Sequence, residues 1–213
     1  MPKSKQIGIG LAFVLMLIIG WRWYEEKKVI IVLDPGHGGS YPGFEQDGVL
    51  EKDIVLEVSQ YVRTELQNKG YTVYLTREGD QLCEEGGYLK DLACRPKLSR
   101  KKHADVFVSI HANGFKDSNV RGAEVYYFTP FRDKQLAEKI GDNYIKETKM
   151  PLRYVKFGNY KVLRETLVPS ALVEIGYLTN KEDMKLLMQD DFKRKSATGI
   201  ALGIEEFLRN QRK

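Results

Sequence analysis

Three short, mostly apolar runs rich in β-branched residues constrain the fold of this chain more than any other feature. They occupy residues 29–33 (VIIVL), 105–110 (DVFVSI) and 170–175 (SALVEI). A strand that is apolar along its whole length, rather than alternating, is buried on both faces, which is typical of a parallel sheet between helices. Segments with helical periodicity separate the runs, so the sequence predicts an α/β fold with a mainly parallel sheet.

The clearest helix is expected at residues 51–69, with Gly70 as its C-terminal cap. Its apolar residues recur at spacings of three and four along one stripe: Ile54, Val55, Val58, Val62 and Leu66. We expect residues 76–93 to be polar and irregular, and Pro96 to lie near the first turn of the next helix. The remaining strands are expected at 71–75 and 123–128 with a short one near 160–163, and the remaining helices at 94–103, 132–148, 180–189 and 191–209.

The N-terminus carries an uncharged, almost wholly apolar segment at residues 7–21 (IGIGLAFVLMLIIGW). A membrane span needs ~17–25 apolar residues, so this segment is at the short end of the range. Lys3 and Lys5 precede it, and the residues after it include Trp23 and Tyr24, which suit a membrane interface. We favour an uncleaved signal-anchor with a short linker over residues 1–28, followed by a catalytic domain over 29–213. A cleaved signal peptide is the alternative, although no A-x-A-like site follows the segment, and a buried core helix is a third reading.

The charge of the chain argues against a nucleic-acid partner. The formal net charge is +5, but residues 1–28 hold five basic and two acidic side chains, which leaves a net of only +2 for the domain. A nucleic-acid-binding domain needs a dense basic stripe on its folded surface. The densest basic stretch, residues 95–103 (RPKLSRKKH), is interpreted as a solvated helix face, with a binding patch as the alternative.

The two cysteines, Cys83 and Cys94, lie in one polar stretch. In an exported protein they could form a disulfide that closes a short loop, or they could remain two free thiols. Neither belongs to a C-x-x-C pair, which argues against a cysteine-based zinc site.

Polar residues with metal and acid–base chemistry stand at the ends of the predicted strands. His37 follows the first strand, His111 follows the strand at 105–110, and Glu174 lies near the end of the strand at 170–175, while Glu51 opens the first helix. Ligands of parallel sheets bind beyond the carboxyl ends of the strands. A catalytic zinc takes three ligands from His, Asp and Glu and leaves a position for water, and a nearby carboxylate serves as the base.

Structural roles are the alternatives at each of these positions. A histidine at a strand end can bond a loop carbonyl, and Glu51 can serve as a favourable charge at a helix N-terminus. A buried Glu174 could pair with an arginine, since an unpaired buried carboxylate is costly.

Four motifs in order carry a resemblance to a known family. They are LDPGHGG at 33–39, Glu51 at the start of the following helix, SIHAN at 109–113 and PSALVEIGYLTN at 169–180. Over residues 29–209 the chain resembles the zinc-dependent N-acetylmuramoyl-L-alanine amidases of the amidase-3 type. The segment LTR at 75–77, Asp80 and Arg95 also fit the pattern of that family.

The resemblance implies a mixed, mainly parallel sheet of about six strands flanked by helices. It also implies one Zn²⁺ per chain, with His37, Glu51 and His111 as metal ligands and Glu174 as the catalytic glutamate. The implied reaction is hydrolysis of the amide that joins the lactyl group of N-acetylmuramic acid to L-alanine in peptidoglycan, which releases the stem peptide.

The compact domain, with one N-terminal anchor and no wall-binding repeats, is similar to the sporulation and germination amidases of the CwlD type. That similarity implies action on the spore cortex, where peptide removal precedes muramic-δ-lactam formation, and a location outside the cytoplasm at the cell wall or in the forespore intermembrane space. It also implies a membrane contact through the N-terminal segment and an activating protein partner. The alternatives are an inert peptidoglycan-binding protein on the same fold and a zinc peptidase that acts on free peptides.

Overall fold

The computed structural model describes Met16 and residues 28–211. The predicted signal-anchor therefore lies outside the described residues, Met16 apart. Within the described part of the chain, no helix combines the length and apolar character that a bilayer span requires.

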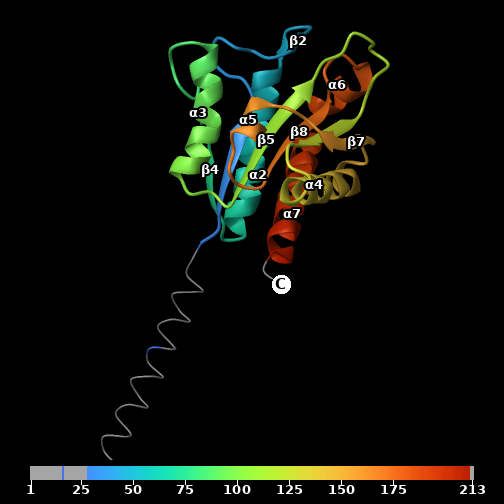
Figure 1. The fold of residues 1–213 in the computed structure, drawn as a ribbon. Helices are drawn as coiled ribbons and strands as arrows, with labels where there is room; N and C mark the ends of the chain where they lie inside the picture. Colours follow the sequence, from blue (N-terminus) through green and yellow to red (C-terminus); the bar gives the residue numbers. More distant parts are fainter. Residues whose placement is uncertain (1–15, 17–27, 212–213) are drawn as a thin grey trace, which may run out of the picture.

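A six-stranded sheet in the order β4-β1-β5-β8-β6-β7 forms the centre of the domain (Figure 1). The first four of these strands run parallel, β6 pairs antiparallel with β8, and β7 pairs parallel with β6 at the edge. The mixed, mainly parallel sheet of six strands is thus confirmed. The strands are β1 (Ile30–Pro35), β4 (Thr72–Leu75), β5 (Val106–Asn113), β6 (Ala123–Tyr127), β7 (Leu152–Phe157) and β8 (Ser170–Tyr177).

Helices cover both faces of this sheet, as the continuous apolar strands require. One face packs against the layer of α2 (Glu51–Asn68), α4 (Arg132–Thr148) and α7 (Asp190–Asn210), where the larger hydrophobic core lies. The other face carries α3 (Tyr88–Lys101) and the short α5 (Lys161–Arg164) over a smaller core. The remaining elements are α6 (Lys181–Leu187) after β8, and the two-stranded ribbon of β2 (Glu45–Gln46) and β3 (Val49–Leu50).

One strand expected from the sequence is misplaced. The short strand expected near residues 160–163 is the helix α5, and the sixth strand is β7, at residues 152–157. Val162 and Leu163 are buried in the smaller core, and a helical turn buries such a short apolar run as well as a strand does. Because β7 is a half-exposed edge strand, its apolar signal is weak.

Helix α3 begins at Tyr88 rather than at residue 94, so Pro96 lies inside the helix rather than in its first turn. The early start brings Asp91 and Arg95 onto one side of the helix, where they form a buried ion pair with Nη2 and Oδ2 2.9 Å apart. Long-range contacts of this pair with the rest of the domain outweigh the helix-breaking tendency of proline.

Candidate active site

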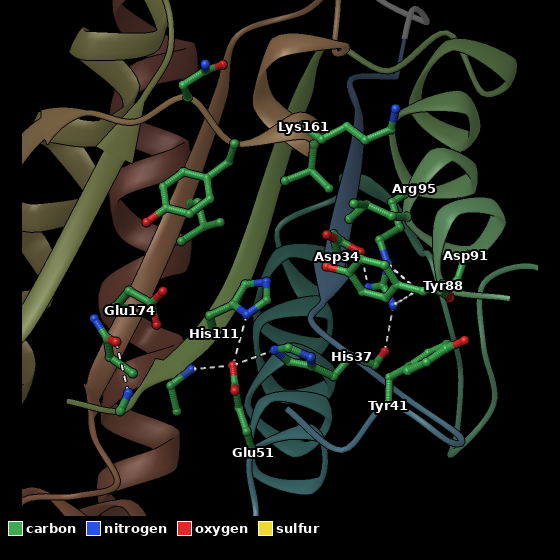
Figure 2. Close-up of a pocket in the computed structure, with 18 residues that line it drawn as sticks. Asp34, His37, Tyr41, Glu51, Tyr88, Asp91, Arg95, His111, Lys161 and Glu174 are labelled. Carbon is green, nitrogen blue, oxygen red and sulfur yellow. Dashed lines mark hydrogen bonds and ion pairs between the residues drawn. The ribbon is translucent and has the colours of Figure 1, made fainter. Parts of the chain in front are cut away.

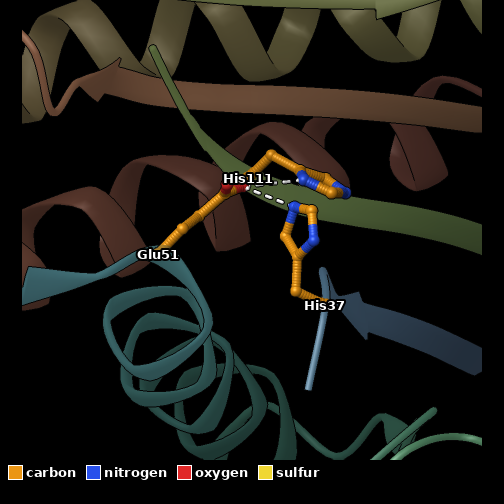
Figure 3. A group of neighbouring side chains, drawn as sticks. All are labelled: His37, Glu51 and His111. Atoms are coloured by element: carbon orange, nitrogen blue, oxygen red, sulfur yellow. Dashed lines mark hydrogen bonds and ion pairs between the residues drawn. The ribbon is translucent and has the colours of Figure 1, made fainter. Parts of the chain in front are cut away.

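Three side chains from distant parts of the sequence converge at the carboxyl end of the sheet (Figure 3). One carboxylate oxygen of Glu51, Oε1, lies 3.0 Å from Nε2 of His37 and 2.9 Å from Nδ1 of His111. The three potential ligand atoms all lie within 4.8 Å of one another. The two imidazole rings meet edge to face, with centroids 4.9 Å apart.

Three elements and two glycines bring this cluster together. His37 lies in the loop after β1 with a left-handed backbone (φ 63°), Glu51 is the first residue of α2, and His111 belongs to β5. A Cβ atom on Gly36 would stand 2.3 Å from the His111 ring, and one on Gly43 would stand 2.4 Å from Oε2 of Glu51. Only glycine leaves room for the site at these two positions.

Glu51 is held in its ionised form by the groups around it. Burial disfavours the charge, but hydrogen bonds from His111 and His37 outweigh burial and hold the pKa of the carboxyl far below its ordinary value. The backbone N–H groups of Ala112 and Phe44 also donate to this carboxylate, at 3.1 and 2.9 Å. The position of Glu51 is therefore fixed by partners from the loop after β1, from β5 and from the residue that precedes β2.

Glu174 stands on β8 directly beside His111 of β5 in the strand register. Its side chain is buried, and its Oε2 atom has no hydrogen-bond partner among the described residues. Burial raises the pKa of this carboxyl to about 8, and the nearby charges of Glu51 and Glu124 act in the same direction against the lowering effect of His111. A carboxyl group in this state is suited to proton transfer near neutral pH.

Two buried arginines hold the loop that carries His37. Arg77 donates to the backbone carbonyls of Pro35, Gly36, Lys52 and Gly79. Arg95 donates to the carbonyls of Pro35 and His37, at 2.9 and 2.7 Å, and pairs with Asp34 and Asp91. These contacts stabilise the left-handed backbone conformation of His37, which a non-glycine residue rarely adopts.

The basic stretch at 95–103 is a solvated helix face, as interpreted from the sequence, except at Arg95. Arg95 is buried in this loop network, whereas Lys97, Arg100 and Lys101 are exposed. Immediately before Arg95, Cys94 forms a disulfide with Cys83, which decides between the two cysteine alternatives. The disulfide joins the irregular segment to the middle of α3.

A cavity of about 400 Å³ opens over the cluster (Figure 2). His37, Glu51, His111 and Glu174 line its floor together, and Tyr41 and Tyr88 stand at one side with ring centroids 5.3 Å apart. On the α5 side its wall includes Asn159, Tyr160 and Val162. The cavity thus gives a substrate direct access to all four residues that the sequence had singled out.

The donor set of the cluster fits a zinc ion. Two imidazole nitrogens and one carboxylate oxygen are a known catalytic zinc set, which leaves a fourth position open. The cluster is open to the cavity, and the described part of the chain supplies no arginine or lysine to pair with Glu51 in its place.

The sequence identified the three members of the cluster and Glu174, and the structure brings these four together. The sequence did not indicate the roles of Arg77, Arg95 and Glu124. All three are charged residues in or beside predicted strands and helices, but their burial and their partners depend on the tertiary structure.

Comparisons with known proteins assign the chain to a family. Residues 31–206 match the family model of amidase-3, described as N-acetylmuramoyl-L-alanine amidase. The chain is 36% identical to the germination-specific N-acetylmuramoyl-L-alanine amidase of Bacillus subtilis, over 95% of this chain and 94% of that protein. It is 33% identical to the amidase LytC of the same organism, over 84% of this chain but only 35% of that longer protein.

Solved structures show the same fold. The catalytic domain of the amidase CwlV from Paenibacillus polymyxa superposes with a TM-score of 0.79 at 34% identity, over 85% of this chain and 98% of that one. The CwlD amidase of Clostridioides difficile, solved in complex with the GerS lipoprotein, superposes with a TM-score of 0.82 at 31% identity, over 86% of this chain and all of that one. The chain therefore belongs to the amidase-3 family of N-acetylmuramoyl-L-alanine amidases.

Proposed function

We propose that this amidase holds one zinc ion through His37, Glu51 and His111 and uses Glu174 to move the proton of the reaction. The scissile bond is the amide between the lactyl group of N-acetylmuramic acid and L-alanine. The observation that supports the proposal is the convergence of two imidazole nitrogens on one Glu51 oxygen, in the same cavity as the unpartnered carboxyl oxygen of Glu174.

A bound zinc ion would polarise the carbonyl of the substrate and would lower the pKa of a bound water molecule towards ~7. In its ionised form, Glu174 accepts the proton of the attacking water and then delivers this proton to the leaving nitrogen. The buried position of Glu174 keeps bulk water from competing for that proton, while the arginine-held loop keeps His37 in place.

We further propose that the enzyme acts on spore-cortex peptidoglycan outside the cytoplasm, in the step that precedes muramic-δ-lactam formation. The germination-specific relative from B. subtilis supports this role, because the two chains match over nearly their whole lengths. Residues 1–28 would hold the domain at a membrane. An activating protein partner is part of the proposal, and the CwlD amidase solved with a lipoprotein supports it.

The activity is tested with the full-length chain in detergent, with zinc, on purified peptidoglycan, and the soluble products are identified by mass spectrometry. Free stem peptides that begin at L-alanine are expected, and chelation should abolish them. Glu174→Gln should lower kcat by roughly 10²–10⁴-fold while one zinc per chain remains bound. The control is Glu138→Gln, a change of an exposed glutamate on α4, which should leave kcat unchanged.

Other outcomes would point to other functions. Wild-type turnover in Glu174→Gln would show that another group moves the proton. Stable muropeptide binding without product, in a zinc-loaded sample, would favour a binding protein. Cleavage of free stem peptides in preference to intact muropeptides would favour a peptidase.

A further inference from the structure

A row of side chains crosses the sheet from the candidate metal cluster to its edge. In the strand register His111 of β5 is opposite Glu174 of β8, Glu174 is opposite Glu124 of β6, and Glu124 is opposite Tyr154 of β7. Residues opposite one another on adjacent strands point to the same face. The site therefore continues sideways, past Glu174, towards the edge strand β7.

Glu124, the next acid in this row, is held by hydrogen bonds and an ion pair. The hydroxyls of Tyr126 and Tyr177 donate to its carboxylate, and Nε of Arg153 lies 2.9 Å from Oε1. Burial opposes its charge, but the hydrogen bonds from Tyr126 and Tyr177 outweigh burial and lower the pKa of Glu124. The carboxylate of Glu124 is thus bound by two hydroxyl groups and a guanidinium group, which reduces its repulsion of an anion.

Lys156 adds an unpaired positive charge at the end of this surface. It is opposite Tyr126 in the register, and its Nζ atom lies 3.8 Å from the ring centroid of Tyr154 and 5.2 Å from that of Tyr126. The side chain is exposed and forms no ion pair with any acid in residues 28–211. The aromatic rings hold the ammonium group in place while its donors stay free.

This surface is continuous with the cavity. Tyr160 lines the cavity, and its ring contacts the Tyr126 ring edge to face with centroids 5.0 Å apart. On the opposite wall of the cavity, Arg95 is not free to bind a carboxylate of the substrate, because it pairs with Asp34 and Asp91. Lys161 also lines the cavity, and it pairs with Glu165.

The chemistry of the reaction gives the direction of the substrate. Glu174 must stand next to the leaving nitrogen in order to protonate it, so the peptide portion begins on the β8 side of the site. Strands lie about 4.8 Å apart, which places β7 about 10 Å beyond β8. An extended peptide covers ~3.3–3.6 Å per residue, so its second or third residue reaches Lys156.

We propose that Lys156, on the platform of Tyr126 and Tyr154, binds a carboxylate of the peptide that leaves the reaction and thereby selects acidic stem peptides. The proposal rests on the proposed function, because the leaving group defines the direction. Arg153 contributes indirectly, through its pairing with Glu124.

The test compares two substrates with the full-length, zinc-loaded chain in detergent: N-acetylmuramoyl-L-alanyl-D-glutamate and the same compound with both carboxylates converted to amides. The wild type should show a KM about fivefold lower for the acid, as expected for one partly exposed ion pair. Lys156→Gln should raise the KM for the acid to that for the diamide and so remove this preference, and Lys156→Arg should restore it. Lys101→Gln, which removes an exposed charge on α3, is the matched control and should keep the preference.

A binding measurement keeps this test separate from turnover. Calorimetry with the product dipeptide L-alanyl-D-glutamate should show binding to the wild type and to Lys101→Gln, weakened about fivefold in Lys156→Gln and by added salt. Equal KM values for acid and diamide, or equal dipeptide affinity in the wild type and Lys156→Gln, would overturn the Lys156 site and leave the amidase intact. Binding of the dipeptide that depends on Lys156, without hydrolysis of either substrate, would support the site and count against the proposed reaction.

Discussion

At the scale of single residues, the site depends on charged groups in places that disfavour charge. Glu174 is buried beside His111, and Arg95 is buried between two aspartates behind His37. Burial disfavours the ionised form of Glu174, whereas the two aspartates stabilise the charge of Arg95. Replacing Glu174 should therefore change the pH dependence of stability, whereas replacing Arg95 should weaken the fold and metal binding.

The pH dependence of stability should report the burial of Glu174. The folded-state pKa of about 8 lies above the ordinary value of 4.5, so the group stabilises the fold fully below about pH 4.5 and loses this contribution as the pH rises towards 8. In the metal-free protein, the free energy of unfolding of the wild type should fall across this window relative to that of Glu174→Gln, by on the order of 4 kcal/mol. Urea unfolding at several pH values in the presence of a chelator measures the difference. A constant difference between pH 5 and 8 would mean that Glu174 is solvated.

Replacing Arg95 should weaken both the fold and metal binding. A lysine cannot reproduce the five donors of the guanidinium group, so Arg95→Lys removes the bonds to Asp91 or the bond to the His37 carbonyl. We expect a loss of about 3 kcal/mol in unfolding free energy and a 10–100-fold loss in zinc affinity, measured by denaturation and by competition with a chromogenic chelator. Arg100→Lys, on the exposed side of the same helix, is the control: Arg100 donates only to the Glu165 carbonyl, which a lysine can also reach, so neither quantity should change. Unchanged zinc affinity in Arg95→Lys would remove this residue from the support of the site.

At the scale of elements, helix α7 packs closely against α4 because two glycines face it. A Cβ atom on Gly199 would stand 2.8 Å from Cα of Tyr144, and one on Gly203 would stand 2.5 Å from Cα of Ile140. Because the atoms in the way belong to the backbone, only a shift of the whole helix could relieve the clash. This contact holds the helical layer over β6 and β8.

Gly203→Ala should therefore destabilise the protein, although alanine is the better helix former. Overpacking costs ~1–3 kcal/mol, against a gain of about 1 kcal/mol in helix propensity. Gly141→Ala is the matched control, since a Cβ there meets the flexible side chain of Leu152 rather than backbone. Thermal unfolding should show a lower Tm for Gly203→Ala than for Gly141→Ala. The reverse order would show that the two helices separate easily.

At the scale of the whole molecule, the candidate ligands come from the loop after β1, the start of α2 and the middle of the sheet in β5. A metal ion that binds all three links separate elements of the folded state, and such an arrangement is absent from the unfolded chain. Metal binding and global stability should therefore be coupled.

Removal of zinc should lower the Tm of the full-length chain. At a free zinc concentration 1,000 times the Kd, the stabilisation is about 4 kcal/mol, which corresponds to roughly 10 °C in a domain of this size. Scanning calorimetry with and without a chelator measures the shift, and His111→Ala should show almost none. An equal effect of the chelator on both proteins would mean that the stabilising metal lies elsewhere.

The sequence by itself determined the class of fold and the identity of the four candidate site residues. Apolar runs such as residues 105–110 and the stripe of α2 follow from periodicity, which is a local property. Similarly, His37, Glu51, His111 and Glu174 were visible because strand ends and helix starts can be located by local signals. The family motifs then assigned them expected roles.

Only the tertiary structure decided which charges are buried and what they bind. The prediction placed a strand near residues 160–163, where the helix α5 lies, and missed the edge strand β7, because a short segment such as YKVL fits either state and a half-exposed edge strand has little periodicity. The roles of Arg95 and Glu124 were not visible, because a buried ion pair depends on partners far away in sequence: Asp34 lies 61 residues from Arg95, and Glu124 meets Tyr177 across 53. Such contacts have no local signature, since they exist only once the sheet has brought its strands together.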